Sequence, residues 1–157
     1  LLDISVADWD EMFAVNTTSM LETTQTVVRS MIDAGHGGKI INMSSMAAKS
    51  GGSGQAHYAA SKAAVAALTR CSAMEFGVHG ITVNCLCPGY VLTDRRDAQL
   101  APDRRARLEA MHLTRLGVAA DVADACVYLA SRESGFVTGV NLQLDGGSSI
   151  ARGRTLG

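Results

Sequence analysis

Residues 39–87 read KIINMSSMAAKSGGSGQAHYAASKAAVAALTRCSAMEFGVHGITVNCLC, and the order of the segments within them indicates the fold class. The apolar, β-branched runs at 39–43 and 81–87 each predict a buried strand. Residues 44–55 are small, polar and rich in glycine, which predicts a loop. The alanine-rich stretch 56–76 predicts a long helix. A strand, a helix and a second strand in this order are typical of two parallel strands joined by a helical crossover.

The segment before this stretch predicts one more helix. Residues 5–8, Ser-Val-Ala-Asp, have the pattern of a capping box, which marks a helix N-terminus. Apolar residues then recur at helical spacing as far as Met31, and the glycine-rich residues 35–38 end the pattern.

The segments after it continue the alternation of helices and strands. Residues 92–112 are charged and irregular and become weakly helical, and a second capping-box pattern predicts a helix that begins at Asp121. Residues 137–144 predict a last strand before the turn at 145–147. The alternation as a whole predicts an α/β fold with a parallel sheet covered by helices on both faces.

Composition excludes several classes of protein. Of the 157 residues 47% are hydrophobic and 18% are charged, as expected when strands are covered on both faces. The formal net charge of −1 does not favour nucleic acid as a partner. The apolar runs end well before the roughly 18 residues that a membrane-spanning helix needs, and no signal-type stretch opens the sequence. The four cysteines form no paired C-x-x-C metal pattern, so we expect small buried thiols and a cytoplasmic location.

Tyr58 and Lys62 are the most informative pair of polar residues. They lie four apart in the predicted helix 56–76, so they share one face of it. An ammonium group beside a phenol stabilises the phenolate, which makes the pair suitable for proton transfer. Ser45, in the preceding loop, could orient a substrate oxygen beside the phenol. Exposed helices carry such Tyr–Lys pairs by chance, so the pair alone does not establish a site.

Five blocks in register resemble the short-chain dehydrogenase/reductase family: residues 15–18, 39–45, 54–64, 83–93, and 137–139 with 144–147. The resemblance extends from about residue 5 to residue 148. It implies the C-terminal half of a doubly wound, Rossmann-like parallel sheet. It also implies a hydride transfer between NAD or NADP and a secondary alcohol or ketone, with no need for a metal.

The resemblance also implies roles for single residues. Tyr58 is similar to the general acid/base, and Ser45 to the serine that binds and polarises the reacting oxygen, with Ser44 as the neighbouring alternative. Lys62 would hold the nicotinamide ribose and stabilise the phenolate. Asn16 would bind a water that links Lys62 to solvent.

Further residues resemble the binding segments of the family. Those expected to contact the cofactor, with Tyr58 and Lys62, are Pro88, Gly89, Val91 and Thr93. Those expected to contact the substrate are Ser45, Gln55, Tyr58 and Tyr90. Five arginines lie in the region that forms a substrate lid in the family: Arg95, Arg96, Arg104, Arg105 and Arg107. We expect them on a solvated helix face, and any that reached the substrate would favour an acidic or phosphorylated one. His57 is expected at the surface or an interface, with the substrate mouth as the alternative.

One family motif is missing. No G-x-x-x-G-x-G pattern occurs, so the sequence does not supply the turn that holds the cofactor pyrophosphate or the residue that selects NAD or NADP. We therefore expect residues 1–157 to form a single, partial domain without the N-terminal cofactor-phosphate half, ending in a loose tail at 149–157. Part of a longer enzyme, a truncated product and one half of a split enzyme all remain open.

The sequence predicts a type of assembly and a broad class of substrate. The family implies a homodimer or homotetramer through the helices that carry Asn16 and Tyr58, with residues 143–147 as a second contact. The edge of the strand at 39–43 would also favour self-association. A small-molecule alcohol or carbonyl compound is the expected substrate. Sugars, polyols, steroids, acyl thioesters and simple ketones all suit the architecture. A non-catalytic, oligomerising fragment is the rival interpretation.

Overall fold

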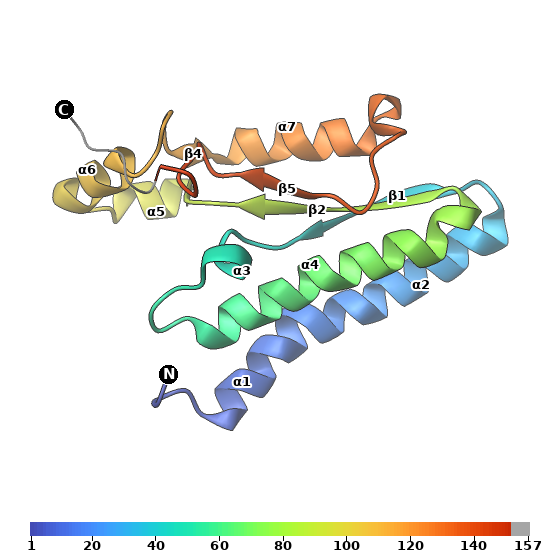
Figure 1. Cartoon of the computed structure of the whole chain (residues 1–157), viewed down its shortest axis with the longest axis horizontal. Coiled ribbons are helices and arrows are strands. Elements are labelled where there is room, and N and C mark those ends of the chain that lie inside the picture. Colours follow the sequence, from blue (N-terminus) through green and yellow to red (C-terminus); the bar gives the residue numbers. More distant parts are fainter. Residues whose placement is uncertain (152–157) are drawn as a thin grey trace.

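The computed structural model describes residues 1–151, apart from the side chain of Arg96. Three parallel strands form the central sheet, in the order β1-β2-β5: β1 (Gly38–Met43), β2 (Ile81–Pro88) and β5 (Asn141–Leu144). Helix α7 (Ala119–Ala130) covers one face, and α4 (Ala56–Phe76) and α2 (Ser19–Ala34) cover the other (Figure 1). The predicted α/β class, with its parallel sheet between two helical layers, is confirmed.

Strand β2 is the centre of the hydrophobic core. Its alternate side chains point to opposite faces of the sheet. Ile81 and Val83 pack with Val28 of α2 and Ala73 of α4, and these four side chains form one buried cluster. Leu86, of the opposite parity, is fully buried. Full burial of an aliphatic side chain of this size stabilises the fold by about 1.5–3 kcal/mol.

The first predicted helix is not continuous. Helix α1 (Val6–Phe13) begins at the predicted capping box, in which the Asp8 N–H donates to Ser5 Oγ at 3.1 Å. The chain then widens into a π-helical turn, Ala14–Thr18, before α2 continues. Helix α2 ends at Gly35, whose φ of 68° lies in the left-handed region that glycine adopts without strain.

Short elements correct the predicted loop 44–55 and define the region 92–112, which was predicted to be irregular and then weakly helical. A short helix, α3 (Ala47–Ser50), interrupts the predicted loop 44–55. The charged region 92–112 contains two short helices, α5 (Asp94–Ala98) and α6 (Pro102–Ala110). A second, two-stranded parallel sheet flanks this region, formed by β3 (Val91–Leu92) and β4 (Gly117–Val118).

Two element boundaries near the C-terminus were wrong. Helix α7 begins at Ala119 rather than at Asp121, because the Asp121 carboxylate accepts a hydrogen bond from the Val118 N–H, at 2.8 Å, within the first turn. The predicted strand 137–144 is a strand only from Asn141, because Asn84 of β2 binds the backbone at Val137 and Val140 instead.

The predicted loose tail lies partly outside the described residues, which end at 151. Within the described part, the Ser149 N–H donates to the Asp145 carboxylate at 2.9 Å, so the chain is still tied down at that point. The expectation of buried thiols holds for Cys85 and Cys87 but is wrong for Cys71, which is exposed, and Cys126 is half-buried. All four are free thiols.

Two features are absent from residues 1–151, a membrane-spanning helix and a metal-binding cluster. No helix there has both the length and the apolar character needed to cross a membrane. No group of three or more histidine, cysteine, aspartate or glutamate side chains in this part of the chain could hold a metal ion.

Asn84→Ala tests how the loop before β5 is held. Asn84 is 1% exposed; its Nδ2 donates to the Val137 carbonyl at 2.8 Å and its Oδ1 accepts from the Val140 N–H at 3.1 Å. The substitution leaves both backbone groups without their partner, so we expect the free energy of unfolding to fall by about 2–3 kcal/mol in urea titration. Gln25→Ala, at an exposed position of α2, is the control and should change it by less than about 0.5 kcal/mol. A loss no larger than that of the control would contradict this account.

Candidate active site

The end of β1 is fastened to α4 by two hydrogen bonds that involve Lys62. The Ser44 hydroxyl donates to the Lys62 carbonyl at 2.7 Å, and the Lys62 ammonium donates to the Met43 carbonyl at 3.1 Å. The loop that follows β1 therefore leaves the sheet beside the first turns of α4, which is where Tyr58 lies.

Tyr58 and Lys62 form the predicted pair. The Lys62 Nζ atom lies 5.9 Å from the centre of the Tyr58 ring, and both side chains are half-buried. Burial, which disfavours the charged form, lowers the pKa of Lys62. Its ammonium has two further N–H groups beside the one that donates to Met43.

A cavity of about 730 Å³, here called the Tyr58 cavity, opens between α1, α3, α4 and α6. All four side chains expected to contact substrate line it: Ser45, Gln55, Tyr58 and Tyr90. Several residues that sequence reasoning missed or placed elsewhere also line it: Met12, Ala47, His57, Gln99, Leu100 and Arg104. His57 is half-buried and lines this cavity, which is compatible with the alternative at a substrate mouth.

The two adjacent serines have different surroundings. Ser44 is 3% exposed and its hydroxyl is engaged by the backbone of α4. Ser45 lines the Tyr58 cavity, and its Oγ accepts a hydrogen bond from the Ala47 N–H at 3.1 Å, which leaves its own proton available. The geometry therefore favours Ser45 over Ser44 as the group that can meet a substrate oxygen.

Asn16 lies in the π-helical turn and reaches α4 rather than Lys62. Its Nδ2 donates to Ser61 Oγ at 3.1 Å and contacts Met12 Sδ at 3.0 Å. Ser61 Oγ in turn donates to the Tyr58 carbonyl at 2.8 Å. Asn16 is thus linked to the backbone of Tyr58 through one serine, and its Oδ1 has no protein hydrogen-bond partner within the described residues.

The segment expected to contact the cofactor is held against the end of β5. The Gly89 N–H donates to the Leu144 carbonyl at 2.9 Å, and a Cβ atom at Gly89 would lie 2.9 Å from Asp145 Cβ, so this approach requires glycine. Pro88 ends β2, and its carbonyl accepts from the Met46 N–H at 2.9 Å. Val91 lies in β3 and lines a different cavity, of about 570 Å³, beside Gly117. Thr93 directly precedes α5.

The groups present fit one end of a nicotinamide dinucleotide. The remaining N–H groups of Lys62 can donate to ribose hydroxyls beside Tyr58. Gly89 lines the Tyr58 cavity. No glycine-rich phosphate turn occurs in the sequence for the pyrophosphate end.

An acidic cavity adjoins the Tyr58 cavity on the side of α1. It has a volume of about 570 Å³, shares the walls formed by Met12, His57 and Tyr58, and adds three carboxylates: Asp3, Asp8 and Glu11. A hydrogen bond from the Ser5 hydroxyl, at 2.6 Å, lowers the pKa of Asp8. The His57 Nδ1 atom is buried and has no hydrogen-bond partner among the described residues.

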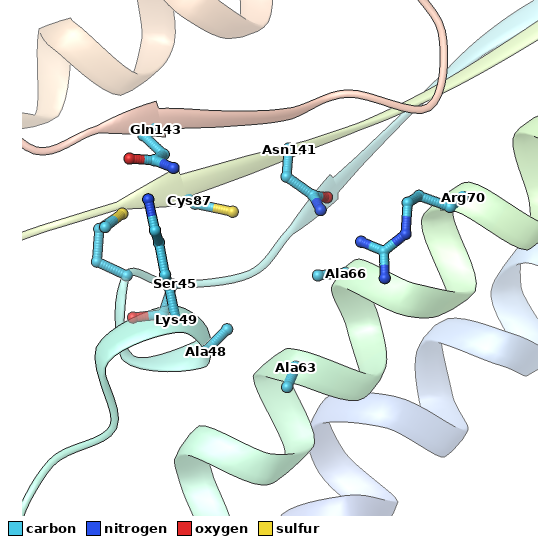
Figure 2. Close-up of a pocket in the computed structure, with 10 residues that line it drawn as sticks. Ser45, Ala48, Lys49, Ala63, Ala66, Arg70, Cys87, Asn141 and Gln143 are labelled. Atoms are coloured by element: carbon cyan, nitrogen blue, oxygen red, sulfur yellow. The ribbon is translucent and has the colours of Figure 1, made fainter.

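Another cavity, of about 270 Å³, lies between α3, α4 and the sheet, and Ser45 lines it as well. Figure 2 shows Lys49 of α3 and Arg70 of α4 entering it, with Cys87 of β2 at its floor. Interaction with the Cys85 thiol lowers the pKa of Cys87 to about 7, and the same interaction, with burial, raises the pKa of Cys85. The two cysteines are two residues apart and lie on one face of β2.

Comparison with known proteins gives concordant matches. Residues 1–149 match the family model described as enoyl-(acyl carrier protein) reductase. An uncharacterized short-chain type dehydrogenase/reductase of Sinorhizobium fredii is 43% identical over 152 residues, covering 95% of this chain and 60% of the relative. A (3R)-3-hydroxyacyl-CoA dehydrogenase of Rattus norvegicus is 40% identical over 149 residues, covering 94% of this chain and 57% of the relative.

A solved structure agrees with these relatives. A short-chain type dehydrogenase/reductase from Mycobacterium ulcerans superposes with a TM-score of 0.89 at 28% identity, covering 96% of this chain and 55% of that one. The chain belongs to the short-chain dehydrogenase/reductase family, whose members are oxidoreductases. It spans less than two thirds of the length of each of these three proteins.

Replacing each of the two serines by alanine separates their roles. We expect Ser44→Ala to lower the free energy of unfolding by about 1 kcal/mol, because it removes the buried hydrogen bond to the Lys62 carbonyl. Ser45→Ala should change stability by only a few tenths of a kcal/mol, since water can replace a half-buried hydroxyl at the cavity wall. Chemical denaturation of both variants under one set of conditions checks this. A larger loss of stability in Ser45→Ala than in Ser44→Ala would refute the structural role given to Ser44.

Proposed function

We propose that the chain carries the catalytic residues of a dehydrogenase/reductase that transfers a hydride between NAD or NADP and a secondary alcohol or ketone. The observation that carries this proposal is the meeting of Ser45 and Tyr58 at one cavity, with Lys62 one helical turn away from Tyr58. A hydroxyl that can orient an oxygen, a phenol that can exchange a proton with it, and an ammonium that stabilises the phenolate form a complete proton-transfer set.

The chemistry assigns one task to each side chain. NAD(P), when bound, supplies or accepts the hydride at the reacting carbon. In reduction, the Ser45 hydroxyl donates a hydrogen bond to the carbonyl oxygen, which polarises the bond. The Tyr58 hydroxyl gives its proton to the same oxygen and takes one back in oxidation. The Lys62 ammonium stabilises the phenolate that remains after the transfer.

Asn16 completes the set as a positioning residue. Its Nδ2 is engaged by Ser61 and Met12, so its Oδ1 can accept a hydrogen bond from a water. Such a water could pass protons between Lys62 and solvent. Pro88, Gly89, Val91 and Thr93 remain the proposed contacts of the nicotinamide carboxamide.

We further assign the chain to a cytoplasmic homodimer or homotetramer that takes a small-molecule substrate. Exposed apolar side chains on the helices that carry Asn16 and Tyr58 support the assembly, among them Val15 at 65% and Met74 at 83% exposure. Strands β1 and β5 are the two edges of the sheet, and an unpaired edge strand favours self-association. The alternative function is a non-catalytic, oligomerising fragment or one half of a split enzyme.

Tyr58→Phe tests the proposed chemistry directly. The chain is incubated with ketones and reduced NAD or NADP, and the oxidation of the nicotinamide is followed by its absorbance. Loss of the phenolic proton should slow turnover by at least about 100-fold, the usual contribution of a general acid. Tyr128→Phe, on the exposed surface of α7, is the matched control and should keep full activity.

Two outcomes would count against the proposal. Turnover that survives in Tyr58→Phe would remove Tyr58 from the mechanism. A wild-type chain that self-associates in sedimentation but oxidises neither cofactor would support the oligomerising fragment instead.

A further inference from the structure

The charged side chains around the Tyr58 cavity are distributed unevenly. On one side of the cavity, α6 contributes Arg104, and residues Gln99 and Leu100 lie between α5 and α6. Among the side chains that the structure describes at this cavity, Arg104 is the only one with a permanent charge, and no carboxylate is present. His57 adds an imidazole to the lining.

Arg104 differs from the other described arginines of α6 in having no counter-ion. Arg105 pairs with Asp97 and lies 3.7 Å from Glu109, and Arg107 pairs with Asp103 at 3.3 Å. No ion pair involves Arg104 within the part of the chain that the structure describes. The expectation of a solvated arginine face fits both Arg104 and Arg107, which are exposed, but Arg104 also presents an unpaired guanidinium to the cavity. Guanidinium groups bind carboxylate and phosphate oxygens through two parallel hydrogen bonds.

The acidic cavity beside α1 carries negative charge, opposite in sign to that of Arg104, on another side of the Tyr58 cavity. Asp3, Asp8 and Glu11 lie beyond the shared wall of Met12, His57 and Tyr58. Figure 1 shows α1 and α6 on different sides of α3. An anionic group in the Tyr58 cavity is therefore repelled from α1 and attracted to α6, which favours one direction of binding.

We propose that Arg104 is a specificity-determining residue that selects ketones and alcohols carrying an anionic oxygen group, a carboxylate or a phosphate. The anion lies against α6 while the reacting oxygen faces Ser45 and Tyr58. The identity of the reacting oxygen rests on the proposed function, but the contact between Arg104 and the anion does not.

Calorimetric titration of the whole chain with three ketones of similar length tests this proposal. The probes are 4-oxopentanoate, its neutral amide 4-oxopentanamide, and 3-oxobutylphosphonate. We expect at least one anionic probe to bind about fivefold more tightly than the amide, a factor near the upper end for a solvent-exposed ion pair. The tighter of the two anions identifies the group that the site prefers.

Two variants of α6 locate the effect. Arg104→Gln should abolish the preference for the anion. Arg107→Gln removes the same charge from the same helix at a residue paired with Asp103, so it should leave the preference intact. Equal affinities for all three probes, no binding by any of them, or a preference that persists in Arg104→Gln would each overturn the proposal.

Turnover measurements distinguish this failure from failure of the proposed function. Hydride transfer at equal efficiency to the amide and the carboxylate would overturn the anion site and leave the proposed function standing. A preference for the anion that depends on Arg104, in a chain that transfers no hydride, would support the anion site and overturn the proposed function.

Discussion

The candidate site depends on the attachment of α4 to the end of β1. One residue, Lys62, takes part in both hydrogen bonds: its backbone carbonyl accepts from Ser44, and its side chain donates to Met43. Helix α4 packs on the sheet through small and β-branched side chains, and polar contacts with β1 fix its position along its own axis. These two hydrogen bonds, with a third from Asn42 Nδ2 of β1 to Thr69 Oγ1 at 2.9 Å, provide such contacts. Because Tyr58 lies one turn earlier on the same helix, its distance from the loop that bears Ser45 is fixed as well.

Strand β2 supports this attachment through its contacts on both faces of the sheet. Its apolar residues bury the inner faces of α2 and α4, while Asn84, of the opposite parity, binds the backbone that leads into β5. Gly89, directly after β2, then contacts the end of β5 so closely that no side chain would fit. The same strand therefore supports the serine, the tyrosine and the segment proposed to contact the nicotinamide, although it contributes no reacting group itself.

Local sequence signals predicted most of the architecture, and failed where distant contacts decide; the roles of the site residues stay predictions from the family resemblance. The helix at 56–76 has the predicted bounds, because glycines follow it and its alanines favour a helix in any context. The start of α7 was misplaced because an acidic residue suits both the cap and the first turn of a helix. The last strand was predicted too long, at 137–140, because its β-branched sequence does not reveal that the Asn84 side chain binds the backbone there.

His57 lies about 100° around the helix from Tyr58, yet both line one cavity, because the cavity wraps around the start of α4. The position of Arg104 depends on how α6 folds back, which no local spacing encodes.

The π-helical turn at Ala14–Thr18 has a consequence for how this chain can vary among relatives. A π turn accommodates one more residue than an α turn, and each residue of a helix rotates the following ones by about 100°. The wide turn therefore sets the phase between α1, whose residues line the two cavities near Tyr58, and α2, whose Val28 is buried against the sheet. Removal of a single residue here would put the two faces out of phase, and Asn16 would turn away from Ser61. Many side chains are compatible with these positions, but only one chain length is, so this helix should accept substitutions far more readily than insertions or deletions.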